Sequence, residues 1–282
     1  MGPNFSDLEP AINQANNEIT SVEQWKILED AQTTSTALIQ DSTFYQMAVN
    51  DEMNEKFDEV LTGNYTSTGD GGTGDSGLEG AAPVQNDTLP DGRDVVVYGS
   101  PDGYADFNHQ QGDNDLGFKE DCGLCSSQDV LNQFGVQVDE NDIVHHAVDN
   151  NECYTNPNDA SQSGQTTADW QAQVMSDYGV PAHVENGGSL DDLAQNVQDG
   201  HGTIIEVNAG ILWNDANSYG DGNSNHAITV TGVVRDPETN QIQGFYVNDS
   251  GDGQAAKFVD AATMQQMWAD VGGQSVVTDA TH

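Results

Sequence analysis

Apolar residues recur along this chain with two different periods, and the first is the period of a helix. Through residues 1–62 they recur at mixed intervals of three and four, which predicts a helical N-terminal segment. This pattern stops at Gly63, and six of the twelve residues over 69–80 are glycine. A stretch so rich in Gly, Asp, Ser and Thr buries too little apolar surface to order itself. We therefore expect a flexible linker over residues 63–92.

Residues 93–282 have the pattern of a separate domain, with mostly helical periods first and mostly strand periods afterwards. Strands rich in Val, Ile, Thr, Phe and Tyr are expected over residues 94–98, 203–207, 227–234, 244–247 and 257–259. Helices are expected over residues 122–134, 140–148, 168–178, 190–198 and 261–271, with Ser189 as the N-cap of the fourth. The polar turn at residues 236–240 would join two strands. This order of elements predicts an α+β fold.

The net charge of the chain limits the classes of molecule that it can bind. The chain has 6 basic and 47 acidic residues, so its formal net charge is -41. A surface this negative is repelled by phosphate backbones and by anionic lipid, so we expect neither a nucleic acid nor a membrane as partner. No apolar stretch approaches the roughly 20 residues of a membrane-spanning helix. Residues 1–20 lack the basic start and apolar core of a Sec signal peptide, so we expect any export to use another route.

The three cysteines are Cys122, Cys125 and Cys153, and this odd number leaves at least one thiol free. Cys122 would lie in the first turn of a helix, where unpaired N–H groups and the helix dipole stabilise a thiolate. Asp121 would oppose that charge, unless its carboxylate caps the helix instead. Gly123 would leave space for an approaching substrate. The alternative interpretation is that Cys122 is a small buried apolar residue.

His226 begins one predicted strand, and Asp249 ends the next. If these strands pair through a turn centred near residue 238, His226 is twelve residues before the centre and Asp249 is eleven after it. Such positions lie side by side, with Cβ atoms roughly 5 Å apart. An adjacent carboxylate can orient an imidazole and stabilise its protonated form. Asn248 is the alternative partner, because neighbouring strand residues face opposite sides. A lone His at a strand end is otherwise an ordinary surface residue.

The segment from Asp121-Cys122-Gly123 to Gly135 resembles the papain-like cysteine peptidases that process bacteriocin leader peptides. The strand that starts at His226, and the sequence Asp-Ser-Gly from Asp249, more closely resemble papain-like domains of bacterial polymorphic toxins and secreted effectors. The resemblance covers about residues 94–272. It implies a helical half that carries the cysteine and an antiparallel β half that carries the histidine and the acid.

Residue roles follow from the same resemblance. It implies Cys122 as the nucleophile, with Cys125 structural, His226 as the base and Asp249 as the acid that orients it. Family members also use a Gln about six residues before the nucleophile to bind the oxyanion, but Leu116 stands there. We assign that role to Gln111, with its neighbour Gln110 as the alternative.

These assignments imply a cysteine peptidase that acts on a protein or peptide through a thioester acyl-enzyme. We expect a secreted effector or toxin domain, cytoplasmic before export by a non-Sec route or delivery into a target cell, with a cognate immunity protein as a further partner. The same triad would also serve a transglutaminase or deamidase, and an inactive acidic binding protein is the competing class. We expect no cofactor or metal, because Cys122-x-x-Cys125 lacks a second pair and the adjacent His145 and His146 lack zinc spacing.

Overall fold

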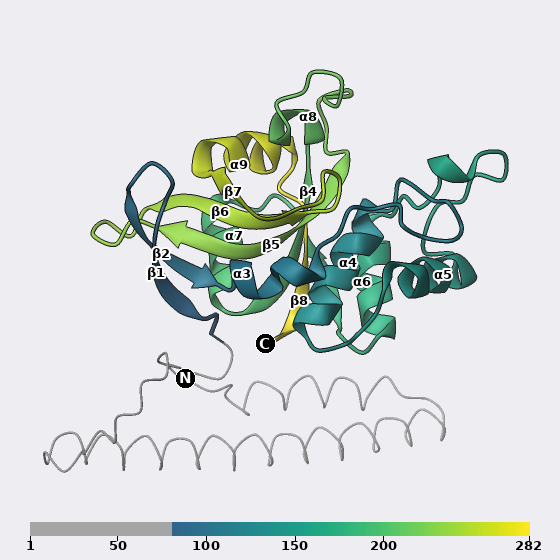
Figure 1. The fold of residues 1–282 in the computed structure, drawn as a ribbon, viewed down its shortest axis with the longest axis horizontal. Helices are drawn as coiled ribbons and strands as arrows, with labels where there is room; N and C mark the ends of the chain where they lie inside the picture. The colour runs from purple at the N-terminus through teal and green to yellow at the C-terminus, as the bar shows by residue number, and fades with distance from the viewer. Residues whose placement is uncertain (1–80) are drawn as a thin grey trace, which may run out of the picture. The chain divides into compact units, whose positions relative to one another are not determined.

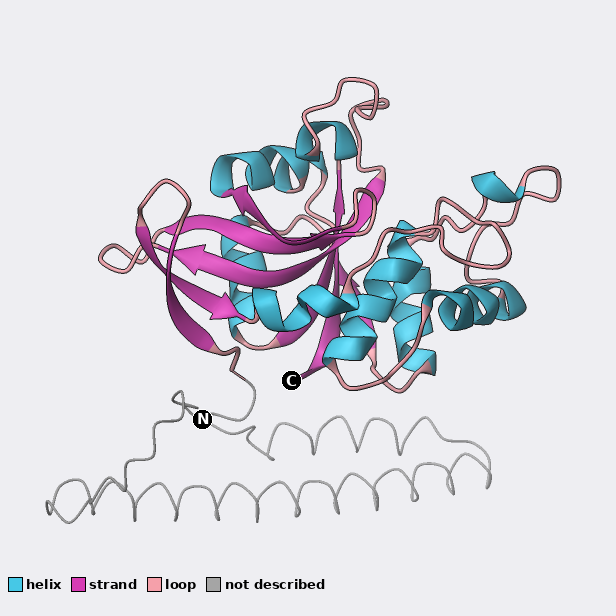
Figure 2. Cartoon of the chain, viewed as in Figure 1, coloured by secondary structure: helices cyan, strands magenta, loops and turns pink. Residues whose placement is uncertain are grey.

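The computed structural model describes residues 81–282, in which a group of helices packs beside an antiparallel sheet (Figures 1 and 2). The helical N-terminal segment predicted over residues 1–62 and most of the linker lie outside the described residues. None of the helices in residues 81–282 has the length and apolar character of a transmembrane span.

Eight strands form the sheet, and every pair of neighbours is antiparallel. The strands are β1 (Val84–Thr88), β2 (Asp94–Gly99), β3 (Ala182–Glu185), β4 (His201–Val207), β5 (His226–Arg235), β6 (Ile242–Asp249), β7 (Gln254–Asp260) and β8 (Ser275–Thr281). One path through the sheet runs β1-β2-β5-β4-β8-β3, while β6 pairs with β5 and β7. The predicted α+β fold is confirmed.

Strand β5 is the centre of the sheet. One of its edges pairs with β6, while residues 226–230 of it pair with β4 and residues 232–235 pair with β2. Every residue of β5 before Arg235 is buried, because helices cover both faces. Ala227 packs into the core on one side and Ile228 into the core on the other, as alternation along a strand requires.

The helices fall into two groups, one for each core. The core formed with α4 (Cys122–Gln133), α5 (Glu140–Asn150) and α6 (Ala168–Asp177) includes Leu124, Ile143 and Met175. The other core is formed with α7 (Leu190–Gln198) and α9 (Ala261–Met267). Ser189 caps α7 as expected, with its side chain accepting from the Asp192 N–H. Two short helices, α3 (Pro101–Tyr104) and α8 (Ala209–Leu212), lie near the ends of strands.

Three expectations about the elements were wrong. The linker expected to reach residue 92 ends earlier, because Val84–Thr88 forms β1 and pairs with β2. Strands β3 and β8 had no predicted counterpart, although they pair with each other and β8 also pairs with β4. The last helix ends at Met267, and a separate 3-10 helix covers Ala269–Val271.

Candidate active site

Cys122 is the first residue of α4, and its side chain is half-buried. The sulfur therefore lies at the end of the helix where backbone N–H groups are unpaired and the dipole is positive. Cys122 also packs against the helical core. It lies where the sequence predicted, at the N-terminal end of a helix.

Asp121, the residue before Cys122, does not cap α4 with its side chain, so that expectation was wrong. Its carboxyl group is fully buried and accepts a hydrogen bond from Asn114 Nδ2 at 3.1 Å. Burial and then the neighbouring Glu140 raise the pKa of Asp121 well above its usual range. The protonated form is favoured as a result, and this weakens the negative charge that would oppose a thiolate next to it.

Gly123 does not leave space for a substrate, contrary to the expectation. It is buried, and a Cβ at this position would lie 2.0 Å from Thr166 Oγ1 and 2.5 Å from Gln171 Nε2. The glycine is needed because α6 and the loop before it pack closely against α4 here. Gln171 Nε2 donates in turn to Glu206 on β4, a half-buried acid near His226 that sequence reasoning had not selected.

His226 and Asp249 form a buried pair beside Cys122. The distance from His226 Nε2 to Asp249 Oδ1 is 2.8 Å, and the two side chains are 5% and 0% exposed. Burial alone would lower the pKa of His226, but hydrogen bonds with Asp249 and Cys122 raise it to about 10. Burial would likewise raise the pKa of Asp249, but His226, the Trp213 indole and Lys257 hold it well below its usual range. The pair is therefore ionic near neutral pH.

The register that brings these two residues together differs from the predicted one by two residues. Thr229 pairs with Asn248, and a β-bulge interrupts the pairing between Val230 and Gly232. Continued past Asn248, this register puts Gly251 opposite His226, and a Cβ at Gly251 would lie 2.9 Å from His226 Cε1. Asp249 reaches the imidazole along the diagonal instead, which is within the range of long side chains.

Asn248 is turned away from the imidazole. Its amide donates to the Tyr104 carbonyl at 2.9 Å and to Asp129 Oδ2 at 2.8 Å. Its carbonyl oxygen accepts from the Ala256 N–H at 3.0 Å. Asn248 and Asp249 are neighbours on β6, so their side chains face opposite sides of the strand. The geometry therefore assigns the contact with His226 to Asp249.

Sequence reasoning missed two partners of Asp249. Trp213, the C-cap residue of α8, donates its indole N–H to Asp249 Oδ2 at 2.8 Å, and its ring centroid lies 5.1 Å from that of His226. Lys257 Nζ lies 3.3 Å from the same oxygen. The only local signal for Trp213 is a large aromatic residue after a strand, followed by a polar loop. Nothing local signals Lys257, because its role depends on the pairing of β6 with β7.

Gln111 forms hydrogen bonds with the segment that follows β6 and with the loop before α4. Its backbone N–H donates to the Ser250 carbonyl at 2.9 Å, and its side-chain Nε2 donates to the Lys119 carbonyl at 2.7 Å. Within residues 81–282 no hydrogen bond joins Gln111 to Cys122. Gln110 is exposed. An oxyanion role for Gln111 requires its amide to turn away from Lys119.

Cys125, one turn further along α4, has different surroundings. It is 3% exposed, and burial followed by the nearby Asp121 and Glu140 raises the pKa of its thiol well above the usual range. His109 Nε2 lies 3.8 Å from its sulfur. This thiol is protonated and inaccessible, so of the two cysteines in the motif only Cys122 has the surroundings of a nucleophile.

Comparison with known proteins assigns the chain to a family. Residues 106–276 match the model of the Peptidase_C39-like family, and the chain belongs to that family. It is 31% identical over 180 residues to uncharacterised proteins of Mycobacterium bovis and Mycobacterium tuberculosis, a match that covers 55% of this chain and 72% of theirs. A crystal structure of a candidate C39-like peptidase from Bacillus anthracis aligns with a TM-score of 0.40 at 18% identity, over 58% of this chain and 90% of that one.

Proposed function

We propose that this protein is a cysteine peptidase that cleaves peptide bonds through a thioester acyl-enzyme. The observation that carries the proposal is the buried hydrogen bond of 2.8 Å between His226 and Asp249, with Cys122 as the other partner of the imidazole. A structural His–Asp pair would have no need of a half-buried thiol at a helix N-terminus. Membership of a peptidase family supports the same conclusion.

Acylation follows from this geometry. The raised pKa of His226 favours a resting imidazolium, and the proton comes from the Cys122 thiol. The Cys122 thiolate attacks the scissile carbonyl carbon, a C–S bond forms, and the carbonyl oxygen becomes an oxyanion. As the carbon–nitrogen bond breaks, His226 donates its proton to the leaving amine. Asp249 holds the imidazole with one nitrogen toward Cys122 throughout.

Deacylation reverses the proton transfers. Neutral His226 takes a proton from water, and the hydroxide attacks the thioester. The C–S bond breaks, the carboxylic acid leaves, and Cys122 regains its starting state with His226. In both halves the backbone N–H of Cys122 and the side chain of Gln111 are the proposed donors to the oxyanion.

The test is incubation of the full-length protein with a peptide library, with products identified by mass spectrometry. Cys122→Ala is the inactive variant, and Cys153→Ala is the matched control because it removes a buried thiol elsewhere. We expect hydrolysed peptides with the wild type and Cys153→Ala, and none with Cys122→Ala. Deamidated or cross-linked glutamine without hydrolysis would instead identify a deamidase or transglutaminase. Equal products from Cys122→Ala would contradict the proposal.

A secreted effector or toxin role with a cognate immunity protein is a further part of the proposal. It is supported by the sequence from Asp249 to Gly251 and by the net charge of -41, which suits a basic protein partner. The test is expression of the wild type and Cys122→Ala inside bacterial cells. Growth arrest by the wild type alone supports a toxin, while equal growth of both strains argues against one.

A further inference from the structure

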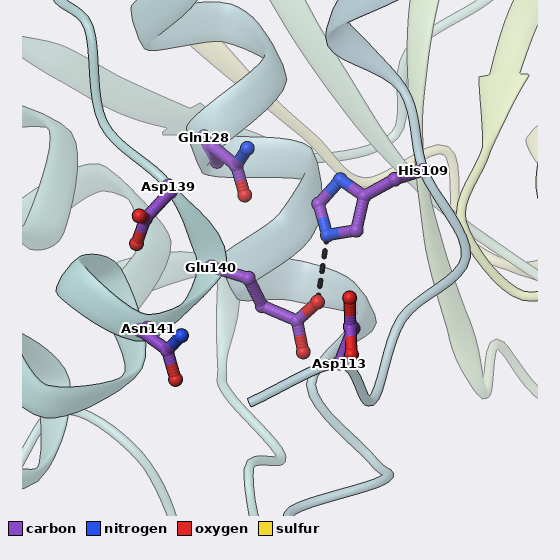
Figure 3. Close-up of a pocket in the computed structure, with 6 residues that line it drawn as sticks. All are labelled: His109, Asp113, Gln128, Asp139, Glu140 and Asn141. Atoms are coloured by element: carbon purple, nitrogen blue, oxygen red, sulfur yellow. Dashed lines mark hydrogen bonds and ion pairs between the residues drawn. The ribbon is translucent and has the colours of Figure 1, made fainter. Parts of the chain in front are cut away.

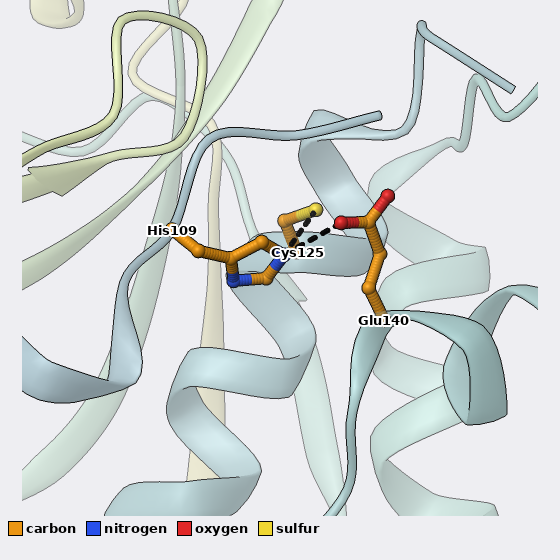
Figure 4. Close-up of side chains that lie close together, drawn as sticks. All are labelled: His109, Cys125 and Glu140. Atoms are coloured by element: carbon orange, nitrogen blue, oxygen red, sulfur yellow. Dashed lines mark hydrogen bonds and ion pairs between the residues drawn. The ribbon is translucent and has the colours of Figure 1, made fainter. Parts of the chain in front are cut away.

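A second group of a cysteine, a histidine and an acid lies one turn further along α4 than Cys122. His109 comes from the loop before α4, Cys125 from α4 itself, and Glu140 is the first residue of α5. His109 Nε2 lies 2.7 Å from Glu140 Oε2 and 3.8 Å from Cys125 Sγ (Figure 4). Three segments far apart in the sequence thus bring a nitrogen, a sulfur and an oxygen donor to one point.

This group is not a second catalytic triad. Cys125 is 3% exposed, so a peptide carbonyl has no access to its sulfur. Glu140 is also engaged beyond His109, because its Oε1 accepts from the Gly112 N–H and from Asn114 Nδ2, each at 2.9 Å. A carboxylate with three donors and a buried sulfur beside one imidazole has the character of a binding site.

We propose that His109 Nε2, Cys125 Sγ and the Glu140 carboxylate bind a divalent transition metal ion of the zinc class. Imidazole, thiolate and carboxylate are the three ligand types that zinc accepts. Bond lengths of about 2.0 to 2.3 Å in a tetrahedron put the donor atoms roughly 3.3 to 3.7 Å apart. The sulfur and nitrogen are already near this separation at 3.8 Å, while the His109–Glu140 hydrogen bond has to open.

Asp121 is an independent sign that a cationic group or a donor belongs here. Its side chain is fully buried, and its Oδ1 has no hydrogen-bond partner within the described residues. Asn114 Nδ2 donates both to Asp121 Oδ2 at 3.1 Å and to Glu140 Oε1 at 2.9 Å, so one amide spans the two carboxyl groups. A buried carboxyl oxygen without a partner is costly in either protonation state. A water on the open fourth position of the metal would donate to it, or accept from it when the carboxyl group is protonated.

A metal ion has a path from solvent, because a pocket of about 230 Å³ opens beside His109 and Glu140 (Figure 3). The other residues that line this pocket are Asp113, Gln128, Asp139 and Asn141. On binding, the thiol proton of Cys125 passes to solvent as the sulfur–metal bond forms.

A second cluster in the described residues provides a matched control. His146, Glu152 and Asp177 also converge, but they contain no sulfur, and Asp177 is exposed. A metal held at that place would have only nitrogen and oxygen ligands. Ligation by sulfur therefore distinguishes the proposed site from it.

The experiment is titration of the full-length protein with Co²⁺, followed by absorption spectroscopy. Cys122→Ala is the background, so that the proposed nucleophile cannot bind the ion. We expect a near-ultraviolet sulfur-to-cobalt charge-transfer band that is lost in Cys122→Ala/Cys125→Ala. The band should persist when Cys153→Ala or His146→Ala is the second substitution.

His109→Gln in the same background is the further variant, because half-buried His109 lies on a loop and its replacement leaves the core intact. It should weaken Co²⁺ binding by at least about tenfold. No charge-transfer band in the Cys122→Ala protein would overturn the proposal. A band that survives Cys125→Ala, or an affinity unchanged by His109→Gln, would overturn it as well.

Discussion

The indole N–H of Trp213 donates a hydrogen bond to Asp249 at 2.8 Å, while the indole ring lies against His226. One side chain therefore contacts both members of the buried pair. Asp249 Oδ1 is engaged by His226 and the Gly251 N–H, and Oδ2 by Trp213 and Lys257. With donors on both oxygens, the carboxylate has one orientation, and this fixes the direction of the imidazole.

Trp213→Phe should lower kcat by roughly ten- to a hundredfold with little change in KM. The substitution keeps an aromatic ring against His226 but removes the N–H that holds Asp249. Hydrogen bonds to charged groups contribute roughly 1.5 to 3 kcal/mol, and each 1.4 kcal/mol lost from the transition state slows the reaction about tenfold. Trp213→Ala should lose more, because water gains access to the pair. Steady-state kinetics on a cleaved peptide provide the measurement, and an unchanged kcat in Trp213→Phe would mean that the indole only fills space.

Cys122→Ala should abolish turnover and leave the melting temperature nearly unchanged. A thiol replaced by a methyl group loses little packing at this half-buried position. Cys125→Ala should keep substantial activity, because its buried and protonated sulfur takes no part in the chemistry. Activity and thermal unfolding of both variants provide the measurement. A dead Cys125→Ala beside an active Cys122→Ala would reverse the assignment of the nucleophile.

Asp249→Asn should slow turnover by roughly ten- to ten-thousand-fold, less than Cys122→Ala does. The amide removes the charge that stabilises the imidazolium and permits the other tautomer of His226. Asn248→Ala should act on stability instead, at a cost of roughly 1 to 3 kcal/mol, because it removes the donor to Oδ2 of the buried Asp129 carboxylate and leaves only Gln133 on Oδ1. Kinetics and urea unfolding of both variants separate the two effects. An active Asp249→Asn with an inactive but folded Asn248→Ala would transfer the orienting role to Asn248.

His226 should make stability fall at alkaline pH. The pKa of its imidazole is raised from 6.5 to about 10 in the folded state, so the folded protein binds this proton more tightly than the unfolded chain does. The stabilisation is complete below pH 6.5 and is lost as pH rises toward 10. The alkaline limb of the rate profile should follow the same proton and move to lower pH in Asp249→Asn. Urea unfolding and kcat/KM measured from pH 6 to 10 provide the test. If the alkaline limb stays at the same pH in Asp249→Asn, the limb belongs to the titration of a group other than His226.

A chain that begins at residue 81 should fold and keep activity, whereas one that begins at Leu89 should be less stable. The second truncation removes β1, which pairs with β2, and the backbone bond from Ala82 to the Gln198 carbonyl. Loss of the strand leaves the edge of β2 without its backbone partners. Thermal unfolding and peptidase activity of the two truncations provide the comparison. Equal melting temperatures would show that β1 adds nothing to the domain.

Local patterns in the sequence determined the elements that carry the candidate site. The helical period after Asp121 put Cys122 in a first turn, and the runs rich in Val, Ile and Thr put His226 and Asp249 at strand ends. Such patterns report periodicity over ten or so residues, and this suffices for the type of each element and for an α+β fold. The motif around Cys122 also indicated the resemblance to papain-like cysteine peptidases.

Only the tertiary structure decided how distant residues meet. The pairing of β5 with β6 is interrupted at two places by β-bulges or irregularities, each worth one residue, and its register puts Gly251, rather than Asp249, opposite His226. Bulges depend on how a strand fits all of its neighbours, so no local pattern reports them. The same reason explains why β3 and β8 were missed, and why His109, Cys125 and Glu140 met from three segments without a sequence motif. Their proximity is a product of packing between α4, α5 and a loop, which periodicity along the chain does not encode.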